Sequence, residues 1–234
     1  MVFQVNPAAA PEVFAVGNEN TKIIVIDDFS ADLAEVRTPA CTAASFSPDG
    51  KSAYPGIRAR LPDDYVEKVL AVVKPLLHKT YAVPEVLELQ TELAYYSLLT
   101  KQEAELNVSQ RIPHFDTNND HYYAVLHYLN NGTFGGTGFF RHRPTGFERI
   151  TEDRKDVFMR SASAFMAVRG MPQPKYINRS TNHFELFAQL EYKPDRLVVY
   201  PGNLLHSGLV SASVDVCDNP ERGRLTANIF VNYN

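Results

Sequence analysis

The sequence of 234 residues predicts a mainly β protein with flanking helices. Short runs rich in β-branched and aromatic residues follow one another after residue 87. Clusters of Gly, Asn, Asp and Pro separate these runs, and such residues accept the backbone angles that turns require. Many short strands divided by turns are typical of a β-sandwich or jelly roll, with helices packed outside it.

The N-terminal part is expected to begin without regular structure. Residues 1–20 are rich in Ala, Pro and Asn and show no clear period, so we expect an irregular arm there. Regular structure is expected from Lys22, because the β-branched run from Ile23 to Ile26 ends at Asp27 and indicates a short buried strand.

Residues 61–81 carry the clearest helical pattern in the chain. Apolar residues recur at intervals of three and four, and Asp63 and Asp64 fall in the first turn. Pro75 is expected to kink or end this helix, because proline removes an amide donor and clashes with the preceding turn.

The second part of the chain is predicted to form the catalytic core. Its candidate strands lie at residues 88–99, 111–116, 122–129, 137–142, 196–200, 208–214 and 224–233. Residues 151–193 interrupt them with charges, two prolines and an apolar-periodic run from Phe184 to Leu190, which predicts a helical or irregular insertion that could cover the site. We therefore expect one domain over residues 21–234, in which 21–87 support a core formed by 88–234.

Composition excludes several classes of function. The formal net charge of −4 and the pI near 6.0 provide no basic field for phosphates, so no nucleic-acid partner is expected. Cys41 and Cys217 have no zinc-site spacing and do not suggest a disulfide framework. The sequence shows no export signal and no membrane span, which predicts a cytoplasmic protein without a membrane partner. The oligomeric state stays open.

Three residues could bind one metal ion. His114 and Asp116 lie two positions apart on a predicted strand, so both side chains project from the same face. His206 follows the turn at Pro201 and Gly202, which could deliver it opposite the first pair. Two histidines and one carboxylate on one face of an octahedral ion leave three positions for a bidentate keto acid and dioxygen. Alone, the spacing of His114 and Asp116 is weak evidence for a metal site, because a histidine that only makes structural hydrogen bonds on a strand would give the same sequence pattern.

The last predicted strand adds an anion-binding candidate. One of its faces carries Arg224, Thr226, Asn228, Phe230 and Asn232, and the other carries Leu225, Ala227, Ile229, Val231 and Tyr233. An arginine on a strand fit for burial needs an anionic partner, and its planar fork binds a carboxylate in bidentate fashion. That partner could be a dicarboxylate co-substrate or an Asp or Glu of the protein.

The order of these motifs resembles the prolyl-hydroxylase-type branch of the iron(II) and 2-oxoglutarate-dependent dioxygenases, over about residues 88–234. The matching elements are His114-Phe-Asp116, the strand ending at His127-Tyr128-Leu129-Asn130, Gly135-Gly136 leading to Phe139, Asp195 to Tyr200 ahead of His206, and Arg224 opening the last strand.

The resemblance implies a double-stranded β-helix core, which is a cupin-like jelly roll. It implies that His114, Asp116 and His206 bind Fe(II) and that Arg224 binds the distal carboxylate of 2-oxoglutarate, with Tyr128 and Asn228 beside it. Tyr128 could equally be a core aromatic whose hydroxyl is bonded elsewhere. The implied reaction consumes O2, converts 2-oxoglutarate to succinate, and hydroxylates an amino-acid-like small molecule or a peptide side chain.

The sequence departs from the compact family pattern in its insertion and in the long interval between His206 and Arg224. Arg222 therefore competes with Arg224 as the carboxylate anchor, although the alternation of the strand favours Arg224. Two other functions stay open: a jelly-roll binding module, and a cupin-like metalloprotein that uses no 2-oxoglutarate.

Overall fold

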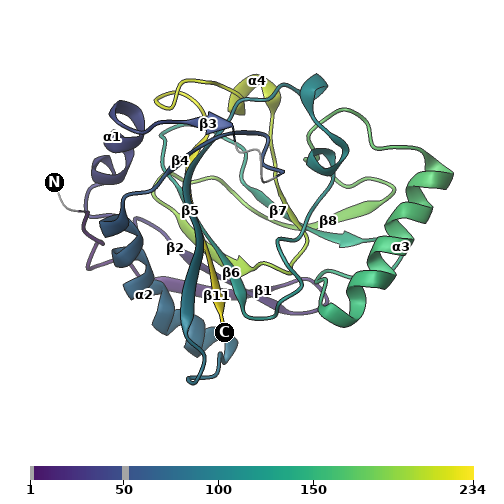
Figure 1. Cartoon of the computed structure of the whole chain (residues 1–234), viewed down its shortest axis with the longest axis horizontal. Helices are drawn as coiled ribbons and strands as arrows, with labels where there is room; N and C mark the ends of the chain where they lie inside the picture. Colours follow the sequence, from purple (N-terminus) through teal and green to yellow (C-terminus); the bar gives the residue numbers. More distant parts are fainter. Residues whose placement is uncertain (1–2, 49–52) are drawn as a thin grey trace.

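Two antiparallel sheets form the body of the protein in the computed structural model, which describes residues 3–48 and 53–234 (Figure 1). The strands are β1 (Pro11–Val16), β2 (Thr21–Ile26), β3 (Ser47–Pro48), β4 (Gly56–Arg60), β5 (Leu89–Leu99), β6 (Tyr122–Tyr128), β7 (Thr137–His142), β8 (Phe184–Leu190), β9 (Leu197–Pro201), β10 (His206–Gly208) and β11 (Leu225–Tyr233). The helices are α1 (Ala34–Thr42), α2 (Asp63–Tyr81), α3 (Glu152–Arg169) and α4 (Ala212–Asp215), with short 3₁₀ helices η1 (Glu103–Glu105) and η2 (Val108–Arg111). The predicted mainly β class with flanking helices is confirmed.

The larger sheet has the strand order β1-β2-β9-β6-β11-β5-β4-β3, and the smaller sheet has the order β10-β7-β8. Helix α2 covers the outer face of the larger sheet, since Tyr65, Val69 and Val73 pack into the same core as β11. Helix α3 lies at the other side of the molecule, beside the smaller sheet (Figure 1), where Phe158 packs against Phe140 and other apolar residues. The two sheets therefore face each other, with a helix behind each.

Strand β11 shows how sequence alternation divides the core into layers. Its residues Leu225, Ala227, Ile229, Val231 and Tyr233 join the core under α2, as the alternation predicted. The opposite face of β11 points between the sheets, where a separate apolar layer joins the larger sheet to Phe139 and Leu190 of the smaller one. The polar face of β11 therefore lies on the side where a site can form.

The structure corrects the expected irregular arm and decides one of the two expected effects of Pro75. The arm expected to be irregular contains β1, which pairs with β2, and Phe3 is buried in the main core; residues 1–2 lie outside the described residues. Helix α2 does not end at Pro75 but continues to Tyr81. The apolar stripe explains this continuation, because Val73 and Leu77 on either side of Pro75 are fully buried and their burial outweighs the lost hydrogen bond.

Three other expectations are also wrong. Residues 111–116 do not form a strand, because η2 ends at Arg111 and only His114 makes an isolated bridge. The strand expected at 208–214 ends at Gly208, and α4 begins at Ala212. The apolar run from Phe184 to Leu190 is not helical but forms β8, because its pairing with β7 supplies the backbone hydrogen bonds. Helix α3 fits the helical insertion that the sequence predicted.

A buried polar chain crosses the interface between α2 and the larger sheet. The hydroxyl of Tyr65 lies 2.9 Å from Nδ1 of His127, and Nε2 of the same histidine lies 2.9 Å from Oδ1 of Asp195. Tyr65 and His127 are almost fully buried, so these bonds are the partners that their polar atoms require. His127 is thus a structural residue, away from the metal candidates.

No helix among the described residues is long and apolar enough to cross a membrane.

Tyr65→Phe is expected to lower the free energy of unfolding by about 1–3 kcal/mol, because Nδ1 of His127 would lose its partner in the core. Tyr233→Phe is the matched control: Tyr233 is equally buried, but its hydroxyl has no hydrogen-bond partner among the described residues. This control should leave stability unchanged or raise it. Urea titration measures both variants, and equal losses would contradict the assignment.

Candidate metal centre

A pair of backbone hydrogen bonds brings the first two candidate ligands together. The amide of His114 donates to the carbonyl of His206 at 2.9 Å, and the amide of His206 donates to the carbonyl of His114 at 2.8 Å. The amide of Asp116 donates to the carbonyl of Gly202 at 2.7 Å, which fixes the third candidate on the same side. Segments far apart in the sequence thereby present three side chains at one point.

The donor atoms of His114, Asp116 and His206 all lie within 4.8 Å of one another. Nε2 of His114 and Nε2 of His206 each lie 3.9 Å from a different oxygen of Asp116. Nδ1 of His206 is 2.8 Å from the carbonyl oxygen of Leu204, so it carries the proton and Nε2 keeps its lone pair for a metal.

This donor set fits a divalent metal ion with open positions. Adjacent ligands at about 2.1 Å from an ion lie about 3 Å apart, so the two 3.9 Å separations between the histidines and Asp116 need to shorten by about 1 Å. The side chain of His114 is 52% exposed, whereas those of Asp116 and His206 are 14% and 7% exposed. The centre is therefore reached from the side of His114, where other ligands could bind.

Desolvation sets the electrostatics of the ligands. It lowers the pKa of His206 to about 4 and raises the pKa of Asp116 to about 6. Desolvation also lowers the pKa of His114, assisted by the nearby charge of His206 and opposed by Asp116. The histidines are thus neutral at pH 7 and available as ligands, and the carboxylate is ionised at some cost.

The structure buries Arg224 and exposes Arg222. Only 5% of Arg224 is exposed, and its guanidinium donates from Nε to the carbonyl of Gly135 at 2.6 Å and from Nη2 to that of Gly136 at 3.4 Å. Arg222 lies in a surface turn, where its amide donates to the carbonyl of Asn219. Arg224 forms no ion pair with any residue that the structure describes, so the expected alternative of a protein carboxylate partner does not occur among them.

Tyr128 lies beside Arg224, as expected, and Asn228 has bonds within the sheet. The Tyr128 ring is 5.4 Å from the Arg224 guanidinium carbon, and its hydroxyl is 2.8 Å from Oγ1 of Thr137. Burial raises the pKa of Tyr128, and the charge of Arg224 opposes that shift. The amide of Asn228 donates to the hydroxyl of Ser97 at 2.6 Å.

Sequence reasoning missed other residues close to the centre. The Tyr200 ring lies 4.8 Å from the His206 ring, and the charges of both Asp116 and Arg224 act on the pKa of its hydroxyl. Burial raises the pKa of Tyr200, and its hydroxyl lies within electrostatic range of both Asp116 and the buried Arg224. The charge of Arg58 on β4 acts on both His114 and Asp116. Arg58 could not be recognised from the sequence, because its strand was not predicted.

Two hollows lie near the insertion, and neither is lined by the three ligand candidates. One, of about 630 Å³, lies between the end of α3, residues 170–184, and Arg111 and Ile112, which precede His114 in the chain. Its walls contain Arg111, Arg169, Lys175 and Arg179, but only one acidic residue, Glu103. The other, of about 750 Å³, borders residues 132–136 and 189–192.

A solved structure of similar fold holds nickel and 2-oxoglutarate. The structure of HygX from Streptomyces hygroscopicus with nickel, 2-oxoglutarate and hygromycin B bound aligns with a TM-score of 0.50, over 92% of this chain and 84% of that chain, at 11% identity. AviO1 from Streptomyces viridochromogenes aligns with a TM-score of 0.43, at 11% identity, over 96% of this chain and 88% of that chain. The α-ketoglutarate-dependent epimerase SnoN from nogalamycin biosynthesis aligns with a TM-score of 0.45, at 9% identity, over 90% of this chain and 78% of that chain. At such identity the likeness to HygX is one of fold.

The fold and the site together define a mainly antiparallel β protein with a His-Asp-His cluster that can hold a metal ion. By sequence, the chain belongs to the family of unknown function DUF6445, which matches residues 7–231. No curated protein matches the sequence significantly.

Asp116→Asn is expected to stabilise the metal-free protein at neutral pH. The folded pKa of about 6 lies above the ordinary value of 3.8, so the folded state binds the proton more tightly and loses stability as pH rises through this window. The variant lacks that penalty and should be more stable by about 1–3 kcal/mol at about pH 8. This advantage should vanish near pH 4. Denaturant titrations of both metal-free proteins measure it, and an advantage that does not change with pH would contradict the assignment.

Proposed function

We propose that this protein is an iron(II)- and 2-oxoglutarate-dependent oxygenase of the prolyl-4-hydroxylase-like branch. The convergence of the donor atoms of His114, Asp116 and His206 within 4.8 Å is the observation that carries the proposal. Two neutral imidazoles and one carboxylate are the ligand set of non-haem iron(II) oxygenases, and they leave positions for a keto acid and dioxygen. When bound, the iron would supply the redox chemistry by which O2 oxidises 2-oxoglutarate to succinate and CO2 and hydroxylates a substrate.

The protein's own residues prepare the metal-binding atoms. The Leu204 carbonyl holds His206 in the tautomer whose Nε2 faces Asp116. Desolvation keeps both imidazoles neutral, and the accessible side of His114 leaves room for further ligands. Asp116 provides a carboxylate at the third protein position, which supports hydroxylation, because a halogenase of this type needs a small residue there.

The surroundings of Arg224 support a dicarboxylate as co-substrate. A buried guanidinium without an ion pair among the described residues attracts an anion, and Tyr128 adds a hydroxyl beside it. The Tyr200 ring contacts His206, and its hydroxyl lies within electrostatic range of this arginine. A dicarboxylate with one end at the metal and the other at Arg224 would thus pass along aromatic walls. Asn228 is proposed to border the same space, although its amide already bonds Ser97.

The order of the strands supports a double-stranded β-helix. From β5 onward, the chain passes between the sheets at every step except from β7 to β8: β5, β6, β9 and β11 lie in the larger sheet, and the His114 bridge, β7, β8 and β10 lie on the side of the smaller sheet. Eight such segments in two facing sheets are the pattern of a jelly roll.

The substrate is proposed to be an amino-acid-like small molecule or a peptide side chain. The hollow beside Ile112 supports an anionic substrate group, because its four cations face a single acid and form no ion pair with any described residue. A carboxylate of an amino-acid-like molecule fits this charge. Residues 151–193 would then contribute to substrate binding rather than to metal binding.

His206→Ala is expected to abolish the weak visible charge-transfer band that anaerobic Fe(II) and 2-oxoglutarate should give with the wild type. Loss of one of three protein ligands weakens the metal site. His78→Ala is the control, since His78 lies on α2 behind the larger sheet and bonds the Val83 carbonyl. Absorption spectra under anaerobic conditions measure the band.

A wild-type protein that shows no band and forms no succinate from 2-oxoglutarate would overturn the proposed function. Iron retention with oxygen uptake that does not depend on 2-oxoglutarate would instead identify a cupin-like metalloprotein. A protein that retains no metal and consumes no oxygen would identify a binding module.

Arg224→Ala is expected to raise the KM for 2-oxoglutarate by about 10–100-fold, because a charge-assisted carboxylate bond contributes about 1.5–3 kcal/mol. Arg222→Ala is the matched control, because it removes the same charge from an exposed turn two residues away. Its KM should stay within about twofold of the wild type. Succinate formation at varied 2-oxoglutarate measures both, and equal KM values for the two variants would refute the role of Arg224.

A further inference from the structure

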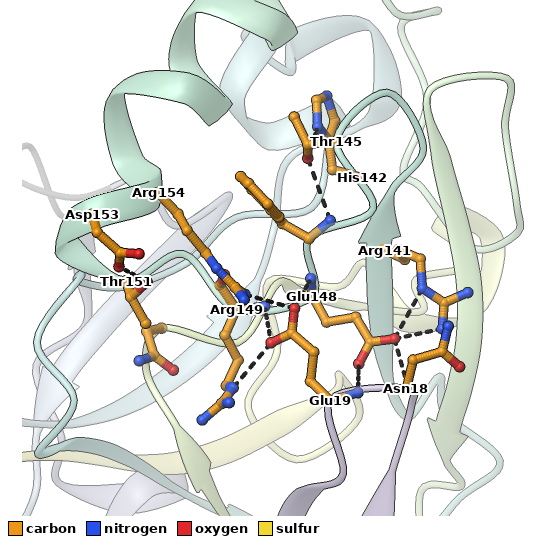
Figure 2. A network of polar contacts seen from close by, with 12 residues as sticks. Asn18, Glu19, Arg141, His142, Thr145, Glu148, Arg149, Thr151, Asp153 and Arg154 are labelled. Carbon is orange, nitrogen blue, oxygen red and sulfur yellow. Dashed lines mark hydrogen bonds and ion pairs between the residues drawn. The ribbon is translucent and has the colours of Figure 1, made fainter.

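Two glutamates outside the candidate site bind each other's backbone (Figure 2). The Glu148 carboxylate accepts hydrogen bonds from the amides of Asn18 at 2.9 Å and Glu19 at 3.0 Å, in the turn between β1 and β2. The Glu19 carboxylate accepts from the amides of Glu148 at 3.1 Å and Arg149 at 3.3 Å. The turn at the N-terminal hairpin is therefore fastened to the segment that follows β7.

Arginines complete this network. Nε of Arg141 on β7 donates to Oε1 of Glu148 at 2.9 Å, and its Nη2 contacts the same oxygen. Arg149 and Arg154 bind the Glu19 carboxylate at 3.1 and 2.7 Å. Figure 2 shows these side chains converging on the two glutamates from β7, from the segment after it and from the start of α3. Three segments meet at a charge-compensated cluster.

The segment that leads to His206 lies between two of these fastened segments. The Leu205 amide donates to the Glu148 carbonyl at 2.8 Å, and the Phe140 amide donates to the Leu205 carbonyl at 2.8 Å. Arg149 forms a bridge with Leu204, and the Ile150 amide donates to the Asn203 carbonyl at 2.7 Å. Residues 203–205 are thus held on both sides up to the candidate ligand.

The Glu148 side chain joins those two sides directly. Its carboxylate bonds Arg141, the neighbour of Phe140 on one side, and its own backbone carbonyl bonds Leu205 from the other. Glu148 is fully buried, so its carboxylate depends entirely on these donors. Gly17 allows the approach: it has a φ of +69°, and a Cβ there would collide with the Glu148 carboxylate.

Glu19 stays charged in this cluster. Burial alone would raise its pKa, but the Glu148 amide and the Arg149 and Arg154 side chains bring the pKa below its usual value. The Glu19 carboxylate therefore acts as a fixed acceptor of hydrogen bonds rather than as a titrating group. An ordinary exposed ion pair would not order a backbone in this way.

We propose that Glu148, supported by Glu19, is a positioning residue that holds His206 in the orientation required for binding metal. This role rests on the proposed function, because it acts on the metal centre assigned there. The N-terminal hairpin thereby becomes part of the metal centre's support, although none of its residues reaches the metal. Residues outside the ligand set typically change metal affinity about 10–100-fold by fixing the ligands.

Co(II) binding tests the proposal, because its visible absorption reports both affinity and ligand geometry. Glu148→Gln keeps the shape of the side chain but replaces one carboxylate oxygen with an amide nitrogen. This nitrogen cannot accept a hydrogen bond from the N–H donors that surround it. We expect Co(II) affinity to fall about tenfold and the absorption bands to change. Glu185→Gln is the matched control, because Glu185 bonds the other side of Arg141, from Nη1 at 2.8 Å, and no bond links its carboxylate to residues 203–206 among those described. The control should bind Co(II) within about twofold of the wild type.

Amide hydrogen exchange of the metal-free proteins provides a second readout. Glu148→Gln should speed exchange at Leu205 and His206 while leaving the β5–β11 pairing at the wild-type rate, whereas Glu185→Gln should change neither. Unchanged Co(II) affinity, spectrum and exchange in Glu148→Gln would overturn the positioning role. A wild type that binds no Co(II) would instead overturn the proposed function, and the exchange data would then show whether Glu148 orders the segment.

Glu19→Gln keeps the test decisive if Glu148→Gln does not fold. Glu19 has a 15% exposed side chain, and its replacement leaves one oxygen in place of the two that accept from the Glu148 and Arg149 amides, while the Arg141 contact stays in place. We expect a smaller loss of Co(II) affinity, about threefold, with faster exchange at the same amides. Wild-type affinity together with wild-type exchange in a folded Glu19→Gln protein would count against the whole network.

Discussion

The two hydrogen bonds between the backbones of His114 and His206 are the contact on which the candidate site depends. They join segments from distant parts of the chain, so the entropy of closing a long loop opposes them until both sheets have formed. The larger sheet reduces this cost, because β6, which follows Asp116, pairs with β9, which precedes His206. Register in the larger sheet therefore decides which residues face each other across the metal centre.

The burial of charged groups at and near the candidate site is electrostatically unfavourable before any ligand binds. Desolvation raises the pKa of Asp116 and lowers that of His206, and Arg224 is buried without an ion pair among the residues described. A protein selected for stability alone would avoid this arrangement, and such strained electrostatics gather at functional sites. A cation bound by the ligands would offset the desolvation of Asp116, and a dicarboxylate would offset the burial of the Arg224 charge. Ligand binding would thus compensate for both unfavourable groups.

The sequence predicted what depends on local pattern. Alternation placed the β11 residues on the correct faces, and the predicted strand 137–142 coincides with β7. Prediction failed where tertiary contacts decide: pairing with β7 makes β8 a strand, although its apolar run was expected to lie in a helical or irregular insertion. The His and Asp candidates were found from their spacing, and the structure brings their donor atoms together. Arg58 and Glu148 could not be found, because their relation to the centre exists only through long-range pairing.

The unequal sheets explain how side chains far from the candidate metal centre can influence it. The larger sheet fixes its strands by long ladders, whereas β10 has three residues and His114 adds a single bridge. With so few backbone hydrogen bonds, the edge that carries the candidate ligands could shift by a fraction of an ångström, and a shift of that size would alter the geometry of a bound metal. Side chains must therefore hold this edge in position. Buried charged groups can do so when each of their hydrogen-bond donors and acceptors has a partner, because their geometry is then fixed. The Glu19 and Glu148 cluster meets that condition, so an N-terminal turn without pattern in the sequence stiffens the edge that presents His206.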